Sequence, residues 1–382
     1  MTNRYHALLD SLEHRWRTTR SPRSHGAFRC SCGRPVFFRN TRCLGCGAPL
    51  GYVPSLGEIK ALTAGEVSGT WLPGGTTPVD RRLHRHCANF DLPAGCNWLV
   101  PVDDATPLCI ACRLNRTIPD LDDADNRRYW HAIELAKRRL VAQLLTLGLP
   151  VIPKSVDPQK GLAFDLLRAA PGGPAVMTGH ADGLITINVE EADDVQRERM
   201  RTAMNEPYRT LLGHFRHEIG HYYWDRLIRG THWLEPFRTL FGDERADYAR
   251  ALSANYDNGP PVDWADRHIS AYASCHPWED WAETWSHFLH AVDSLDTAVS
   301  HGLDADDIDM EFEPFGREAL YDPDHPDADR TLLLINSWME MITFLNEMAR
   351  SLGQPDFYPF TMSMTVVKKL HFVSLVVADW RS

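Results

Sequence analysis

Eight of the nine cysteines lie within the first 112 residues, and no other feature constrains the fold of this 382-residue chain as strongly. They form two quartets: Cys30, Cys32, Cys43 and Cys46, then Cys87, Cys96, Cys109 and Cys112. The N-terminal stretch has no apolar core typical of a secretory signal, so we expect a reducing, cytoplasmic setting in which disulfides are rare. The cysteine spacing therefore predicts metal binding rather than disulfides.

In the first quartet, CSCGRPVFFRNTRCLGCG, each pair of cysteines is followed directly by a glycine, Gly33 or Gly47. Glycine lets the backbone turn tightly, so that its amides can point at the thiolates, as in a zinc knuckle. The segment PVFFRN between the pairs has strand character and fits a hairpin. We therefore expect a zinc ribbon with one structural zinc ion over residues 26–55.

The second quartet is looser, because Cys87 and Cys96 are nine residues apart, although CIAC has the spacing of a good knuckle. Two alternatives stay open. The four thiols can be buried and metal-free, or His84 or His86 can replace one cysteine as a ligand. Because four cysteines complete a structural site, we expect a second zinc-binding region over residues 56–118.

The charge is distributed unevenly along the chain. Residues 1–120 carry a net charge of +6, whereas the whole chain carries -11. A basic segment can indicate nucleic-acid binding, but two four-cysteine zinc centres would reduce this charge to about +2. We therefore expect no nucleic-acid partner, and we favour a protein partner for the zinc-ribbon region. No apolar run is long enough for a bilayer, so we also expect a soluble chain without a membrane partner.

The remainder of the chain predicts a mostly helical domain with a small sheet, over residues 119–382, preceded by an extension over 1–25. The whole is then an α+β protein. We expect helices over 127–149, 205–230, 244–256, 264–274, 278–292 and 332–350. The run from Leu184 to Val189 alternates and predicts a strand. The segment 358–380 fits either a helix or a strand.

The helix expected over 205–230, with Asn205 as its cap, carries HFRHEIGHYYWD. In its HExxH pattern, His217 and His221 lie one turn apart on one helix face, where both can bind the same zinc ion. Glu218 lies beside that ion, where it can take a proton from a bound water molecule. The pattern therefore predicts a catalytic zinc site.

Such a site normally has a third protein ligand. Trp224 and Leu227 stand where the metzincin pattern requires glycine and histidine, so that class is excluded. The segment HPWEDWAETWSHFLH instead offers Glu279 and Glu283. We favour Glu279 as the ligand and Glu283 as the acceptor of a ligand imidazole N–H, with the reverse assignment open.

Other residues near these ligands have weaker signals. His287 continues the face of Glu279 and Glu283 as a further ligand candidate, and the stripe Trp278, Trp281 and Trp285 indicates core packing. His214 is expected to support the metal ligands or face the substrate. Asp225 either accepts an imidazole N–H or is solvated, and Tyr272 either donates to an oxyanion or packs as core. Cys275 has no partner that would make it a nucleophile.

The C-terminal two thirds resembles the gluzincin-type metallopeptidases, and YASCHPWEDWAE is similar to the lethal-factor type of toxin peptidase. The resemblance implies a catalytic role for Tyr272 and metal binding by Glu279. The whole chain also resembles a bacterial family of zinc-binding metallopeptidases that join an N-terminal zinc ribbon to such a domain. Matching stretches include FRCSCGRPVFFRNTRCLGCG, CIACRLNRTIPDL, EPYRTLLGHFRHEIGHYYWD and HPWEDWAETWSHFLH.

We therefore expect a zinc peptidase with one catalytic and two structural zinc ions, acting on a peptide or protein with Glu218 as general base. In zincins an edge strand pairs with the substrate backbone, and our candidate comprises Gly183, Leu184, Ile185, Thr186 and Ile187. Two rivals stay open. One is a zinc-ribbon module that binds protein or nucleic acid beside an inactive helix; the other is a zinc hydrolase of a non-peptide amide.

Overall fold

The computed structural model describes residues 28–75, 81–170, 172–203, 206–303, 308 and 312–380. The chain forms two compact units, which we call the N-terminal unit (His25–Met204) and the C-terminal unit (Asn205–Ser382). The extension expected over 1–25 and the expected cap Asn205 lie outside the described residues. The α+β class, with a zinc-ribbon-like region before a mostly helical part, is confirmed.

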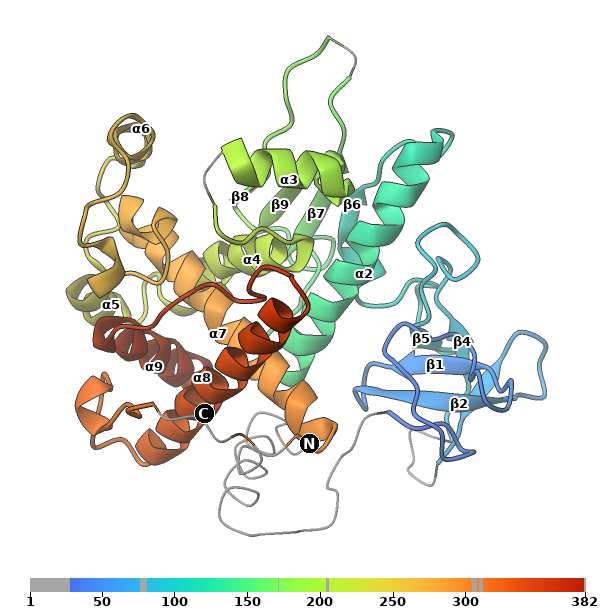
Figure 1. The fold of residues 1–382 in the computed structure, drawn as a ribbon. Helices are drawn as coiled ribbons and strands as arrows, with labels where there is room; N and C mark the ends of the chain where they lie inside the picture. The colour runs from blue at the N-terminus through green and yellow to red at the C-terminus, as the bar shows by residue number, and fades with distance from the viewer. Residues whose placement is uncertain are drawn as a thin grey trace. The chain divides into compact units, whose positions relative to one another are not determined.

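The N-terminal unit begins with an antiparallel five-stranded sheet whose strands lie in chain order (Figure 1). They are β1 (Leu50–Val53), β2 (Glu58–Ala64), β3 (Trp71–Pro73), β4 (His84–His86) and β5 (Leu99–Pro101). Val53, Leu62 and Leu99 form the buried cluster of this sheet. The predicted strand PVFFRN is wrong: the Asn40 side chain accepts the Phe37 N–H at 2.7 Å and stabilises a turn instead.

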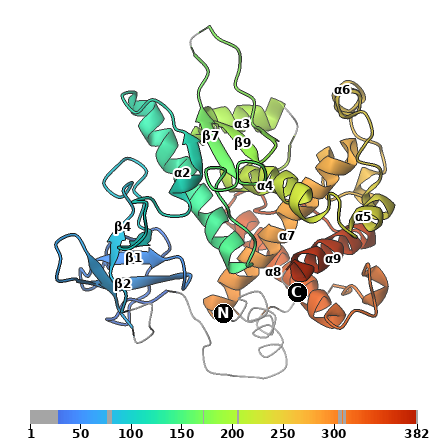
Figure 2. The ribbon, with the colours of Figure 1, turned by 180° about the vertical axis from the view of Figure 1, so that it is seen from behind.

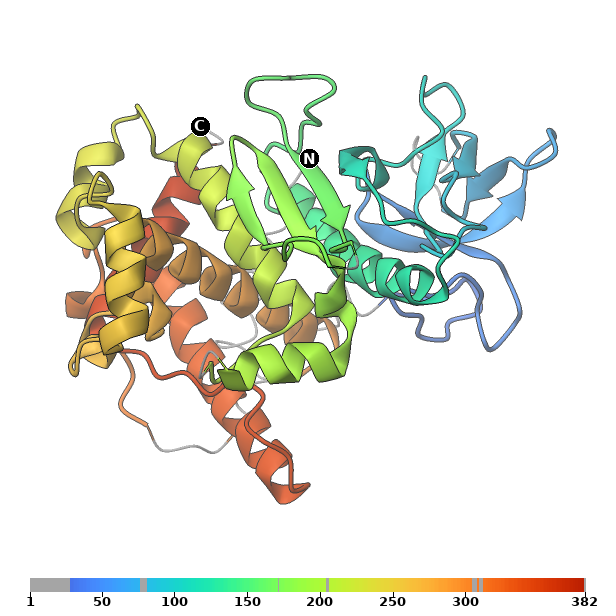
Figure 3. The ribbon, with the colours of Figure 1, turned by 90° about the horizontal axis from the view of Figure 1, so that it is seen from above.

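A second sheet of four strands follows in the same unit, and its later strands are drawn as neighbouring green arrows in Figure 3. Its strands are β6 (Asn115–Thr117), β7 (Ala163–Leu167), β8 (Gly179–Ala181) and β9 (Leu184–Asn188), in the order β6-β7-β9-β8. The strand expected over 184–189 is present as β9. Its expected edge position is wrong, because β9 pairs with β7 on one side and with β8 on the other.

The long helix α2 (Ala124–Thr146) begins at the cap Asp123, whose side chain accepts the N–H groups of Asp125 and Asn126. The four apolar residues that predict this helix are all buried: Trp130, Ile133, Leu140 and Leu144. Helix α3 (Asp194–Ala203) closes the unit. The boundary between the two compact units thus follows α3, and the domain boundary expected near residue 118 lies inside the N-terminal unit. Pairing of β6 with β7 joins the two sides of that expected boundary.

The C-terminal unit is built from helices. They are α4 (Leu211–Leu227), α5 (Leu234–Phe241), α6 (Tyr248–Asn258), α7 (Pro277–Ser300), α8 (Ala328–Ser351) and α9 (Met364–Asp379). Helix α7 is central and packs against α4, α8 and α9 (Figure 1 and Figure 2). Trp281 and Trp285 of α7 are fully buried, as their spacing predicts. None of the described helices is both long and apolar enough to span a membrane.

Two of the expected helices differ from the observed ones. The HExxH helix α4 begins six residues after Asn205, because the Thr210 side chain caps it by accepting the Gly213 N–H at 3.0 Å. The helix expected over 264–274 is wrong: the segment holds only the short 3-10 turns Trp264–Asp266 and Tyr272–Cys275. Ser270 accepts the Ala273 N–H through its side chain, which competes with a regular helix.

Candidate metal centre

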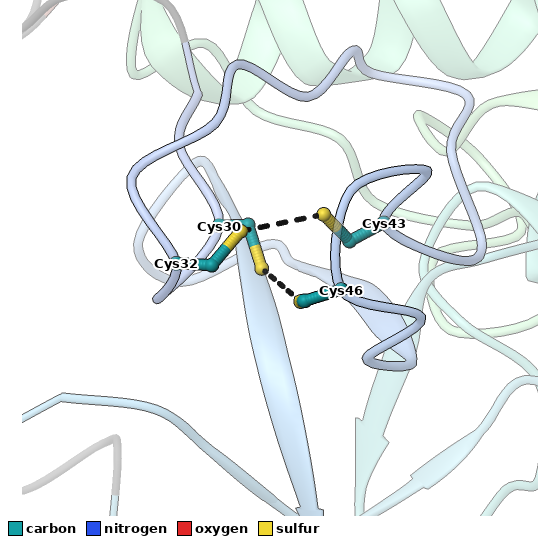
Figure 4. A group of neighbouring side chains, drawn as sticks. All are labelled: Cys30, Cys32, Cys43 and Cys46. Carbon is teal, nitrogen blue, oxygen red and sulfur yellow. Dashed lines mark hydrogen bonds between the residues drawn. The ribbon is translucent and has the colours of Figure 1, made fainter.

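The first cysteine quartet gathers around one point (Figure 4). The sulfur atoms of Cys30 and Cys46 are 3.6 Å apart, and those of Cys32 and Cys43 are 3.7 Å apart. Four thiolates around a zinc ion, each with a bond of about 2.3 Å, would lie about 3.8 Å from one another. The donor set therefore fits a structural zinc ion and is too widely spaced for disulfides.

Local backbone geometry favours the thiolate form of Cys43, whereas the neighbouring thiols of Cys30 and Cys32 raise the pKa of Cys46 to about 12. Gly33 and Gly47 have the positive φ angles that their sequence positions predict, +83° and +73°. The backbone N–H groups of Cys46 and Gly45 lower the pKa of Cys43 to about 6. Amides pointing at a thiolate are the arrangement expected of a zinc knuckle.

The second quartet is also assembled, and all four of its cysteines are buried. The sulfur atoms of Cys96 and Cys109 are 3.7 Å apart, and the Cys109 N–H donates to the Cys87 sulfur at 3.3 Å. The alternative histidine ligands lie elsewhere: His84 contacts the Arg82 carbonyl and His86 stacks on Phe90. Four cysteines without a histidine therefore form this candidate zinc site.

The catalytic candidate joins α4 to α7. The donor atoms of His217, His221 and Glu279 all lie within 4.8 Å of one another. Oε2 of Glu279 is 3.0 Å from Nε2 of His217 and 3.4 Å from Nε2 of His221. Zinc bonds of about 2.0–2.1 Å would place tetrahedral ligand atoms about 3.3 Å apart. The three buried side chains thus fit a zinc ion and leave its fourth position for water or substrate.

Glu283 lies where the favoured assignment expects it, beside the imidazole of His217. Its Oε1 accepts from Nδ1 of His217 at 2.7 Å, and its Oε2 accepts from the Ser270 hydroxyl at 2.6 Å. Burial raises the pKa of Glu283, but the hydrogen bonds with His217 and Ser270 outweigh it and lower the pKa to about 2. An ionised carboxylate on Nδ1 leaves Nε2 of His217 directed at the metal position.

The same carboxylates determine the charge of His217 before metal binds. Burial lowers the pKa of this imidazole, but Glu279 and Glu283 together raise it well above its usual value. Two carboxylates beside one imidazole favour positive charge at this point, and a zinc ion bound by neutral His217 would supply that charge.

Glu218 lies in α4 between the two histidine ligands and is 5% exposed. Its Oε2 accepts no hydrogen bond from any residue that the structure describes. Its Oε1 is 3.7 Å from Nε2 of His214, which is therefore a neighbour of Glu218 rather than a member of the metal-ligand group. A buried carboxylate oxygen with spare acceptor capacity can receive a proton from a water molecule beside the metal position.

Three aromatic side chains flank the ligands. Tyr272 lies with its ring centre 5.9 Å from that of His217, and burial raises the pKa of its phenol, which therefore stays protonated. Trp278 lies with its ring centre 3.8 Å from that of His221, so it is part of the site and not of the core stripe. The Tyr248 hydroxyl donates to Oε1 of Glu279 at 2.8 Å. Sequence reasoning missed Tyr248 and Ser270, since neither has a spacing linked to the HExxH pattern.

The other residues singled out by the sequence lie in different surroundings. His287 is buried against the Tyr358 hydroxyl and is not part of the ligand group. Asp225 forms an ion pair with Arg229 at 2.8 Å. Burial raises the pKa of Cys275 to about 12, so its thiol stays protonated. The candidate substrate strand is β9 of the N-terminal unit, which has no free edge.

Gly220 is where α4 comes close to α7. A Cβ atom at this position would lie 3.0 Å from the Ala282 Cα and 3.2 Å from its carbonyl oxygen, both backbone atoms. Alanine gains about 1 kcal/mol of helix propensity, whereas overpacking costs about 1–3 kcal/mol. We expect Gly220→Ala to lower the free energy of unfolding by about 1 kcal/mol and to weaken metal binding, because it moves His221 away from Glu279. Urea unfolding measures the free energy of unfolding, and zinc titration measures the metal affinity. If both stay unchanged in Gly220→Ala, α4 does not approach α7 closely at this residue.

The chain is similar to known sequences over nearly all its length. Residues 126–376 match the family model described as "Putative zinc-binding metallo-peptidase", and residues 27–123 match a zinc-ribbon domain. Uncharacterized proteins of Mycobacterium bovis and of two Mycobacterium tuberculosis strains are each 43% identical over 354 residues, which cover 92% of this chain and 95% of theirs. No solved structure matches the chain.

Proposed function

The chain belongs to the family of zinc-binding metallopeptidases, and from this premise we propose that it hydrolyses peptide bonds at the centre formed by His217, His221 and Glu279. The observation that carries the proposal is the position of Glu218. A structural metal site needs no acid between its two histidines, yet this one is buried there with an oxygen that accepts no hydrogen bond from the described residues. That favours hydrolysis over a purely structural metal site.

The side chains of the centre would divide the work as follows. A zinc ion held by His217, His221 and Glu279 would supply a Lewis acid and a water molecule whose pKa is lowered to about 7. Glu218 takes a proton from the attacking water and delivers it to the leaving amine. Glu283 holds the ring of His217 in place throughout, through the hydrogen bond to Nδ1.

Tyr272 supplies the hydrogen bond to the developing oxyanion in this proposal, because its protonated phenol lies next to His217. We expect Tyr272→Phe to lower kcat about 10²–10³-fold, with KM and zinc content nearly unchanged. Steady-state kinetics on a cleaved peptide, together with metal analysis, measure these values. Unchanged kcat would mean that Tyr272 only packs against the ligands.

A peptide library tests the function itself. We expect zinc-loaded protein to cleave a subset of peptides, and we expect cleavage to stop after chelation and return with zinc. Amides of acylated lysine side chains, offered in parallel, separate a peptidase from a hydrolase of non-peptide amides. Cleavage of the side-chain amides alone would replace the peptidase proposal with that second activity.

We also propose that the two cysteine quartets each hold a structural zinc ion, and that the zinc-ribbon region binds a protein partner or substrate. Leu44, between Cys43 and Cys46, is 97% exposed, and Phe37 is exposed nearby in sequence. Exposed apolar side chains on a metal-stapled loop are typical of protein contacts rather than nucleic-acid contacts. Eight cysteines that form no disulfide favour a reducing compartment such as the cytoplasm.

A further inference from the structure

The two oxygen atoms of Glu279 face different partners. Oε2 is the atom directed at the nitrogen atoms of His217 and His221, at 3.0 Å and 3.4 Å. Oε1 instead accepts from the Tyr248 hydroxyl at 2.8 Å. A carboxylate can bind zinc through one oxygen or both, and the phenol occupies the oxygen that would otherwise turn toward the metal. The Tyr248 hydroxyl therefore keeps one oxygen of Glu279 away from the metal position.

Tyr248 is also the first residue of α6, a helix with no buried residue. Figure 1 shows α6 standing at the margin of the C-terminal unit. The ring of Tyr248 contacts His276 and Trp278 edge-on, at 5.3 Å and 6.0 Å between ring centres. Just before the helix, the Ala246 carbonyl lies 3.1 Å from Nε2 of His276. The N-terminal end of α6 is thus attached to the residues that surround the metal ligands.

A helix without buried side chains has little packing energy of its own, and short helices are marginal in isolation. The order of α6 must therefore depend on contacts such as the hydrogen bond from Tyr248 to Glu279. Because Glu279 is held most firmly when it binds metal, the same hydrogen bond links the helix to the state of the site.

We infer that Tyr248 is a positioning residue that fixes Glu279 as a one-oxygen metal ligand and ties helix α6 to the metal centre. The inference rests on the metal site of the proposed function. If Tyr248 acted only by packing, phenylalanine would serve equally well, because it keeps the ring and its edge-on contacts. The hydroxyl is therefore the atom to remove.

The test compares Tyr248→Phe with Tyr256→Phe, which removes the same hydroxyl from the same helix at a side chain that is 59% exposed. The first readout is the Kd of zinc at the catalytic site, measured by competition with a chromophoric chelator. We expect Tyr248→Phe to raise this Kd about 10-fold, as loss of a partner of a metal ligand typically does, and Tyr256→Phe to leave it unchanged.

The second readout is amide hydrogen exchange in α6, with and without zinc at the catalytic site. We expect zinc to slow exchange in the wild type and in Tyr256→Phe, but not in Tyr248→Phe. If the wild type binds zinc and Tyr248→Phe has the same zinc Kd and the same exchange in α6, the inference is overturned. The proposed function is unaffected by that result. A wild-type chain that binds no metal at His217, His221 and Glu279 overturns both.

Discussion

Replacing Glu218 by glutamine is expected to lower kcat about 10²–10⁴-fold while the protein keeps its full zinc content. Glutamine has nearly the same shape as glutamate, but its amide cannot take the proton of the attacking water. The side chain is not one of the three that gather at the metal position, so its replacement leaves those ligands in place. Hydrolysis of a library-derived peptide and metal analysis of the same sample give both values.

The control is Glu235→Gln, which makes the same chemical change on α5 at a side chain that is 79% exposed. We expect this variant to match the wild type in both activity and zinc content. If Glu218→Gln keeps full activity, another group must be the general base. Loss of zinc from Glu218→Gln would instead make Glu218 part of the metal-binding machinery.

The second large effect is expected at Lys137, which is completely buried in α2 beside the second cysteine quartet. Its Nζ donates to Oε1 of Glu134 at 2.6 Å, and it also donates to the Asn115 side chain. Oε2 of the same glutamate lies 4.0 Å from the sulfur of Cys112. The Glu134 carboxylate thus lies between the Lys137 ammonium group and the sulfur of Cys112.

We expect Lys137→Met to lower the free energy of unfolding by about 3–5 kcal/mol, because it leaves the Glu134 carboxylate buried without its closest cation. A four-cysteine zinc centre carries two net negative charges, which increases the cost of a buried carboxylate whose remaining cation, Arg138, lies 3.8 Å away. Two measurements on the zinc-loaded protein report this change in the free energy of unfolding. The first is guanidinium unfolding, and the second is hydrogen exchange in α2.

Two further variants make this prediction specific. Lys160→Met removes the same charge from an exposed position of the same unit and should change stability by no more than about 0.5 kcal/mol. Adding Glu134→Gln to Lys137→Met should recover part of the lost stability, since it also removes the buried negative charge that has lost its closest cation. Equal, small effects of Lys137→Met and Lys160→Met would show that the buried pair contributes little.

Much of the candidate site could be predicted because its signals are local in the sequence. His217 and His221 share a helix face at any helix boundary, so the error in the start of α4 did not affect their pairing. The same holds for Glu279 and Glu283 on α7. The turns after the cysteine pairs are also local features of a few residues. The positive φ angles of their glycines, such as Gly33, were therefore predictable from the cysteine spacing.

The other features of the site and of the fold depend on tertiary contacts, which leave no periodic pattern in the sequence. Tyr248 and Ser270 reach Glu279 and Glu283 from turns and a separate helix, through single hydrogen bonds. Trp278 belongs to an apolar stripe by spacing, yet it lies on His221 because it is in the first turn of α7. The short strands β3, β4 and β5 have three residues each, too few to show alternation. The prediction that β9 is an edge strand was wrong for a similar reason, because the three-residue strand β8 pairs with β9.

The most direct test of the account is the number of zinc ions per chain in the wild type and in His221→Ala. His221 belongs to the candidate catalytic site and to neither cysteine quartet, so this change should empty one site only. We expect three zinc ions in the wild type and two in His221→Ala. Two zinc ions in both proteins would contradict it, because the buried histidines and glutamates of α4 and α7 would then hold no metal.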